Sequence, residues 1–270
     1  MKLVAWIGED ECHKAIACKL HVNKGLAGLV IKRTPSFFKN LSAGVLFEKA
    51  IENFAVRHIN TSWKGMQQYY RSNFPAYPEV ETLYCESIDD PDVISFTNKF
   101  APDLVVLSGV EVYQTKTIET NLKIGYLQIH NGLAPYVNAG SNSTNLCISN
   151  KAFHLLGNAI LWLRNNQNTP DIFSSETTHF EGKEPLRDIY IKIMEHGHDL
   201  CLRSLRMISE GKLTSFQQEK VEGADLVINK KWGFTEKQNL LKGLAAFSSH
   251  VNSLEAIRLR EKLTLFTLRR

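Results

Sequence analysis

Short apolar runs alternate with longer segments of helical periodicity along the first two-thirds of the chain. Six runs are each long enough to form one strand, namely residues 3–8, 26–33, 80–87, 102–109, 122–130 and 157–165. Four segments repeat apolar positions at helical spacing, namely 12–21, 42–70, 91–100 and 184–212. Strands that alternate with helices are typical of a sheet covered by helices on both faces. The pattern therefore predicts an α/β fold with a doubly wound, mostly parallel, Rossmann-like sheet.

Details of these elements indicate which parts are buried. The run PDLVVLSG (102–109) is almost wholly apolar, which predicts a central strand. Asp90 and Pro91 form a typical helix start, because Pro fits the first helical turn. Trp6 and Trp162 lie on strand-like runs, so we expect them in the core. The segment 184–212 predicts a long amphipathic helix whose buried stripe consists of Leu186, Ile189, Ile193, Leu200, Leu205 and Ile208.

The chain changes character at about Leu213, where it becomes more polar but keeps two further helical patterns. We therefore predict a main domain at residues 1–212 and a small C-terminal module at 213–270.

The composition is that of an ordinary globular protein and narrows the function classes. The 270 residues are 43% hydrophobic and 22% charged, and 32 basic against 28 acidic residues give a net charge of +4. This excess is small and evenly spread, which argues against a nucleic-acid groove. No apolar run approaches the roughly 18 residues of a membrane span. Five scattered cysteines without a C-x-x-C pair, and a start without a signal peptide, predict a cytoplasmic protein with reduced thiols.

The stretch LQIHNGLAPYVNAGSN (127–142) places His130 at the end of a predicted strand, directly before a turn. Parallel sheets bind ligands beyond the carboxyl ends of their strands, and the run VVLSGVEVY (105–113) ends at the same edge. Either His130 belongs to a site at that edge, or it only caps a surface turn.

Several common motifs are missing. The first strand is followed by GEDECH instead of Gly-x-Gly-x-x-Gly, which disfavours a dinucleotide cofactor. The chain contains no Gly-x-x-x-x-Gly-Lys-Ser/Thr and no Gly-x-Ser-x-Gly. His196 and His198 have no third ligand at useful spacing, so we expect no metal site there.

The order of the elements and the short sequence motifs at their ends resemble those of the 10-formyltetrahydrofolate-dependent formyltransferases, especially the branch that N-formylates sugar nucleotides. The resemblance rests on four segments, namely PDLVVLSGVEVY (102–113), LQIHNGLAPYVNAGSN (127–142), LGNAILWLRNNQNTPDIF (156–173) and HGHDLCLRSLRMISEGK (196–212). The motif HNGLAPY, within the second of these segments, is the most specific part of the resemblance. The resemblance implies a catalytic domain at 1–212, 10-formyltetrahydrofolate as co-substrate, an amine on a nucleotide-linked sugar as acceptor, and a role in polysaccharide biosynthesis.

The resemblance also implies site residues by position. His130 corresponds to the family's histidine, which moves protons, and Gln128 and Asn168 occupy the positions of its amide and its aspartate. The implied folate-binding residues are Ser108, Gly109, Val110, Asn165 and Asn168. The implied substrate-binding residues are Asn131, Tyr136 and Tyr113.

Two of the three catalytic positions depart from the family pattern, which has Asn and Asp. Gln128 keeps an amide donor but adds one methylene, and Asn168 carries no negative charge to orient an imidazolium. Pro170 replaces a glycine of the same loop, and Leu161 replaces a second histidine found in many members. Asp171 is an alternative acid, although its register predicts that it points away.

These departures leave two hypotheses. The chain is an enzyme of the sugar-nucleotide branch, or a catalytically silent relative that binds folate or nucleotide sugars. Action on initiator tRNA is disfavoured by the low net charge and the short C-terminal part. The oligomeric state stays open, with a homodimer as one alternative.

Overall fold

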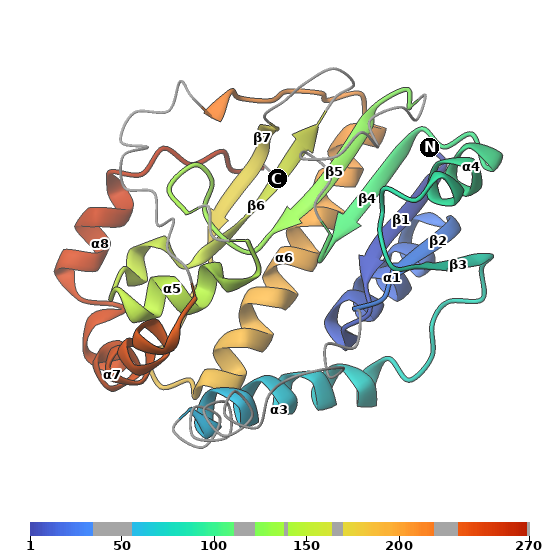
Figure 1. Cartoon of the computed structure of the whole chain (residues 1–270). Helices are drawn as coiled ribbons and strands as arrows, with labels where there is room; N and C mark the ends of the chain where they lie inside the picture. Colours follow the sequence, from blue (N-terminus) through green and yellow to red (C-terminus); the bar gives the residue numbers. More distant parts are fainter. Residues whose placement is uncertain (35–55, 111–121, 138–139, 164–169, 219–231, 269–270) are drawn as a thin grey trace.

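One mixed sheet organises the molecule. The computed structural model describes residues 1–34, 56–110, 122–137, 140–163, 170–218 and 232–268. Its seven-stranded sheet has the order β3-β2-β1-β4-β5-β6-β7 (Figure 1). The strands are β1 (Leu3–Gly8), β2 (Leu26–Lys32), β3 (Thr82–Cys85), β4 (Leu104–Ser108), β5 (Gly125–His130), β6 (Gly157–Leu163) and β7 (Asp171–Thr177). Strands β1 to β5 pair in parallel, and β6 and β7 are antiparallel. The predicted α/β fold with a mostly parallel, doubly wound sheet is confirmed.

Helices cover both faces of this sheet. They are α1 (Glu11–Lys24), α3 (Arg57–Asn73), α4 (Pro91–Lys99), α5 (Ser143–Ser149), α6 (Leu186–Ser209), α7 (Phe234–His250) and α8 (Leu254–Glu261), with short 3₁₀ turns at Gly140–Asn142 and Phe153–Leu155. Alternate side chains of β1 point to opposite faces. Leu3 and Ile7 pack in one core with residues of α1 and α6, whereas Val4 and Trp6 pack in another core with Val93 of α4. None of the described helices is both long and apolar enough to cross a membrane.

The predicted burial agrees with the structure. All six stripe residues of α6 are at most 5% exposed. Trp6 and Trp162 are buried, and their indole N–H groups donate to Thr97 Oγ1 and to the Ile124 carbonyl, each at 3.0 Å. The start of α4 is as expected, because Asp90 accepts a hydrogen bond from the backbone N–H of Asp92 at 3.1 Å.

Two elements differ from the sequence prediction. Strand β7 was not predicted, because its sequence DIFSSET is polar; its serines are nevertheless buried, and Ser174 and Ser204 share a hydrogen bond of 3.1 Å. The helix predicted at 42–70 begins at Arg57 in the described chain and runs on to Asn73. Residues 42–55 of that prediction lie outside the described residues.

The C-terminal segment packs against the rest of the chain at several places. Helix α7 lies along α5, as Figure 1 shows. Phe216 exchanges two backbone hydrogen bonds with Ile172 of β7, and the backbone of Phe266 bonds to Ser175. The described part of 213–270 is therefore in contact with the free edge of the sheet.

Buried ionisable groups predict how stability depends on pH. Burial alone would raise the pKa of Glu176 and Glu184, but hydrogen bonds from Arg203 and His196 to Glu176, and from Lys192 and backbone N–H groups to Glu184, lower both pKa values to about 2. A carboxylate with a lowered folded-state pKa stabilises the protein above its unfolded pKa of about 4.5, and this stability is lost as pH falls toward 2.

Two buried histidines make stability depend on pH in a different range. Burial lowers the pKa of His13 to about 4 and that of His198 well below its usual value, so stability should also fall between pH 6.5 and 4. We expect the free energy of unfolding, measured with denaturant at several pH values, to decrease through both windows. Glu184→Gln should flatten only the decline below about pH 4.5, whereas Glu79→Gln, at an exposed carboxylate, should leave the profile unchanged. Equal profiles for Glu184→Gln and the wild type would contradict the prediction.

Candidate active site

A cavity of about 1080 Å³ opens at the carboxyl ends of the parallel strands. Its floor is formed by the residues that end β4 and β5, and helices α3 and α6 contribute further walls. Ser108, Gly109 and Val110 come from the first strand end, and Gln128 and His130 from the second. The structure therefore brings the two strand ends together in one cleft, as parallel pairing of β4 with β5 requires.

His130 is the last residue of β5, and its ring is almost completely buried. Its Nε2 lies 2.9 Å from the carbonyl oxygen of Val137. A carbonyl only accepts, so Nε2–H donates; in the neutral form of the ring, Nδ1 then carries the lone pair. Gly132 permits this arrangement, because a Cβ at that position would lie 3.0 Å from His130 Nε2. The turn after β5 thus fixes both the orientation and the tautomer of His130.

Gln128 lies two residues before His130 on the same strand. Side chains at this spacing point to the same face of a sheet, and both residues line the cavity. Gln128 pairs with Leu107 of β4 on one side and with Leu161 of β6 on the other. An amide N–H donor and an imidazole are therefore available next to each other in the cleft.

Asn131 also lines the cavity, and the nitrogen of its amide is hydrogen-bonded within the protein. Its Nδ2 donates to Met194 Sδ at 3.2 Å, and its Oδ1 is buried near Gly197 of α6 without a hydrogen-bond partner in the described chain. Asn158 Oδ1 approaches the same glycine. Gly197 therefore allows α6 to lie close to β6 and to the turn after β5.

Tyr136 is placed differently from the expectation that it binds substrate. It is fully buried in the core, and its hydroxyl accepts a hydrogen bond from the backbone N–H of Thr264 at 2.8 Å. The residues that line the cavity do not include it. Tyr136 therefore connects the C-terminal segment to the turn that follows His130 and lies in the core rather than in the wall of the cavity.

Three of the expected site residues, Tyr113, Asn165 and Asn168, lie outside the described residues. Asp171, the alternative acid, begins β7 opposite Trp162 and accepts a hydrogen bond from Ser215 Oγ at 2.8 Å. It does not line the cavity. This position agrees with the register argument that its side chain points away from His130.

The cavity contains a second histidine that sequence reasoning missed. His13 lies in the first turn of α1, and its Nδ1 is 2.8 Å from Ser108 Oγ at the end of β4. Burial lowers its pKa to about 4, so the ring is neutral near pH 7. The sequence does contain a hint of this position. His13 follows the first strand by only a few residues, and the carboxyl end of that strand lies at the same edge of the sheet.

Sequence reasoning also missed the charged residues of the cavity. Lys32 ends β2, Arg57 and Lys64 come from α3, and Asp10 precedes α1. The described wall thus holds three cations and one carboxylate, which favours an anionic ligand. Burial, followed by the nearby charges of Glu9 and Glu11, raises the pKa of Asp10.

The two histidines of the long helix have structural partners. His196 Nδ1 lies 2.7 Å from Thr178 Oγ1, and His198 is buried with its Nδ1 3.3 Å from Lys19 Nζ. Across the described ranges, no group of three or more His, Cys, Asp or Glu side chains is arranged to hold a metal ion.

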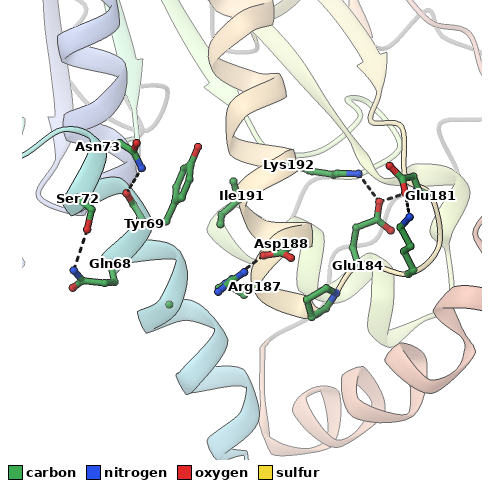
Figure 2. Close-up of a pocket in the computed structure, with 13 residues that line it drawn as sticks. Gln68, Tyr69, Ser72, Asn73, Glu181, Glu184, Arg187, Asp188, Ile191 and Lys192 are labelled. Atoms are coloured by element: carbon green, nitrogen blue, oxygen red, sulfur yellow. Dashed lines mark hydrogen bonds and ion pairs between the residues drawn. The ribbon is translucent and has the colours of Figure 1, made fainter.

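A second hollow of about 840 Å³ lies between α3 and the first turns of α6 (Figure 2). Its charged side chains pair with one another: Lys192 with Glu184, Lys183 with Glu181, and Arg187 with Asp188. We place the candidate active site not in this hollow but in the cavity at the strand ends, which is lined by His13, Gln128 and His130.

Comparison with solved structures identifies the fold. A Mycobacterium tuberculosis protein provisionally described as a sugar N-formyltransferase superposes with a TM-score of 0.52 and 15% identity, covering 90% of this chain and 87% of that one. A phosphoribosylglycinamide formyltransferase from Anaplasma phagocytophilum gives the same TM-score at 12% identity, covering 85% and 99%. This chain has the formyltransferase fold.

Sequence comparison also finds formyltransferases, over a shorter part of the chain. A methionyl-tRNA formyltransferase from Clostridium tetani is 23% identical over 164 residues, which cover 58% of this chain and 52% of that protein. One from Syntrophus aciditrophicus is 23% identical over 141 residues, 52% and 45% of the two chains. The chain thus spans about half the length of these curated relatives. No model of a protein family matches the sequence.

Proposed function

We propose that the chain is an N-formyltransferase that moves a formyl group from 10-formyltetrahydrofolate to the amine of a nucleotide-linked amino sugar. The observation that carries this proposal is the pair formed by Gln128 and His130, an amide donor and an imidazole, at the ligand-binding edge of a sheet with the formyltransferase fold. The choice of a nucleotide-linked amino sugar as acceptor rests on the motif HNGLAPY and on the charged residues of the cavity.

The two side chains suit the two demands of the reaction. The folate would supply a formyl group on a nitrogen that can leave as an amine. When the acceptor nitrogen adds to the formyl carbon, negative charge develops on the formyl oxygen, and the Gln128 N–H donor can stabilise it. The acceptor nitrogen must then lose a proton, which the lone pair of His130 Nδ1 can take and later pass to the departing nitrogen.

The cavity fits a large donor and a phosphate-bearing acceptor. Its volume of about 1080 Å³ exceeds the roughly 300–1,000 Å³ of a pocket for one drug-sized ligand. Ser108, Gly109 and Val110 line this space, and in the proposal their turn contacts the donor. Lys32, Arg57 and Lys64 can neutralise phosphates on the acceptor side.

We also propose that residues 1–212 form the catalytic domain and that 213–270 form a small supporting module. The hydrogen bond from Thr264 to Tyr136 supports a role for this module in holding the turn that orients His130.

A second candidate function is a silent relative that binds the same ligands. It is favoured by the Asn at position 168 and by Asp171, whose carboxylate is engaged with Ser215 outside the cavity. In this case no carboxylate at these two positions would orient His130.

The two candidates are separated by a single-turnover assay of formyl transfer to a panel of amino-sugar nucleotides. We expect measurable transfer by the wild type and at least a tenfold faster rate for Asn168→Asp, because a carboxylate raises the basicity of a neighbouring histidine. Asp171→Asn is the matched control, and its rate should equal that of the wild type.

Other outcomes of this assay would decide against parts of the proposal. Ligand binding without transfer, in the wild type and in Asn168→Asp alike, would establish the silent relative. Transfer to methionyl-tRNA but to none of the sugar nucleotides would overturn the proposed acceptor.

A further inference from the structure

His13 occupies a space that two glycines leave open at the ends of neighbouring strands. A Cβ on Gly109 would overlap the imidazole, with His13 Cδ2 at 2.6 Å and Cε1 at 2.7 Å. A Cβ on Gly8 would lie 3.2 Å from His13 Cδ2. The ring is therefore packed between the end of β1 and the end of β4, in contact with both.

The residue that His13 touches is the one at which the chain turns. Gly109 has a φ of +70°, a conformation that side chains other than glycine rarely adopt, and it directly follows β4. The hydrogen bond between His13 Nδ1 and Ser108 Oγ fixes the preceding residue of the same turn. One imidazole thus restrains two consecutive residues of the Ser108–Gly109–Val110 turn.

The chemistry of the ring fits a role in positioning. His13 lines the cavity beside this turn, so a change in its side chain would alter both the turn and the adjoining wall. The ring is neutral near pH 7, so no buried charge opposes its close packing on the two glycines.

We infer that His13 is a positioning residue of the formyl-donor side, which holds the Ser108–Val110 turn in the conformation that binds the folate. The identity of the ligand rests on the proposed function. The hydrogen bond to Ser108 and the close packing on Gly109 come from the structure alone.

The test compares His13→Ala and His13→Asn with His21→Ala, an exposed histidine on the same helix. Binding of 5-formyltetrahydrofolate is measured by calorimetry, and kcat and KM are measured for donor and acceptor. We expect His13→Ala to raise the donor Kd and KM about tenfold, with kcat within threefold and the acceptor KM unchanged. His13→Asn should recover part of the loss, because its amide can still bond to Ser108. His21→Ala should behave as the wild type.

The packing of His13 on Gly109 is tested separately by thermal unfolding. Gly109→Ala should lower Tm by the strain of its positive φ and by the overlap with the ring. Removing the ring relieves the overlap, so the double variant with His13→Ala should lose less than the two single losses combined. Additive losses would overturn the proposed contact.

The outcomes for His13 and for the proposed function can be told apart. If the wild type binds 5-formyltetrahydrofolate and His13→Ala binds it equally well, or if only kcat falls in that variant, the inference is wrong while the proposed function stands. If the wild type binds no folate, the proposed function fails, and the assignment of His13 to a donor site fails with it.

Discussion

Replacing His130 with alanine should lower the single-turnover rate of formyl transfer by about 10²- to 10⁴-fold, the usual contribution of a positioned acid–base residue. The expectation follows from the position of His130 in the wall of the cavity, where its Nε2–H is held by the Val137 carbonyl. Without the imidazole, the attacking amine must give its proton to water. The rate is measured with saturating donor and acceptor, so that a change in binding does not mimic a change in chemistry.

Two comparisons keep a loss of activity separate from a loss of folding. His21→Ala, on the exposed surface of α1, should keep the full rate. His130→Ala loses the hydrogen bond to Val137, so its Tm and circular dichroism must be shown to match a folded protein before the rate is interpreted. A folded His130→Ala variant that transfers formyl at the wild-type rate would remove His130 from the mechanism.

The architecture could be predicted from the sequence because its central strands are buried on both faces. Residues 102–109 and 122–130 are mostly apolar runs. A strand that is buried on both faces reads as such a run, because neither face needs polar side chains. The long helix α6 could also be predicted, because its apolar residues repeat at helical spacing over more than six turns.

Strand β7 could not be predicted for the opposite reason. Its middle is polar, yet Ser174 and Ser175 are completely buried, because the first bonds to Ser204 of α6 and the second to the backbone of Phe266. Both partners are distant in sequence. No local pattern distinguishes a buried, satisfied serine from a serine in a loop.

The candidate site shows the same limit. Gln128, His130 and the Ser108–Val110 turn could be placed together, because strand ends of a parallel sheet share one edge. His13 was missed although it follows the first strand, because its contact with Gly109 joins positions almost one hundred residues apart. The burial of Tyr136 could not be predicted either, because its hydroxyl bonds to Thr264, which follows it by 128 residues.

Replacing Gly243 with alanine should destabilise the protein by about 1–3 kcal/mol, the usual cost of adding a methyl group to a close-packed core. Gly243 lies in α7 where this helix contacts α5. A Cβ at this position would overlap the carbonyl oxygen of Ile148 and lie 2.9 Å from its carbonyl carbon. These are backbone atoms, which cannot rotate away as a side chain can. Alanine favours the helix by up to about 1 kcal/mol over glycine, but the overlap should outweigh this gain.

The Gly243→Ala substitution should also disturb other contacts that α7 makes with the core. Leu240 and Phe247 are buried on the same face of α7, and Phe247 packs edge-on against Phe153 and Phe180 with ring centroids 5.5 Å apart in each pair. Moving α7 outward to admit a methyl group would loosen both aromatic contacts at once. The free energy of unfolding, measured with denaturant near pH 7, should therefore fall for Gly243→Ala.

Gly65→Ala is the matched control, because Gly65 is also a glycine inside a helix but its added Cβ would meet only the flexible side chain of Arg187 at 2.9 Å. Arg187 is about half exposed and can move aside, so this variant should be as stable as the wild type or slightly more stable. Equal stability of the two alanine variants would show that α7 does not lie as close to α5 as the structure has it. Neither glycine lines the cavity at the strand ends, so the rate of formyl transfer per folded molecule should be unchanged in both variants.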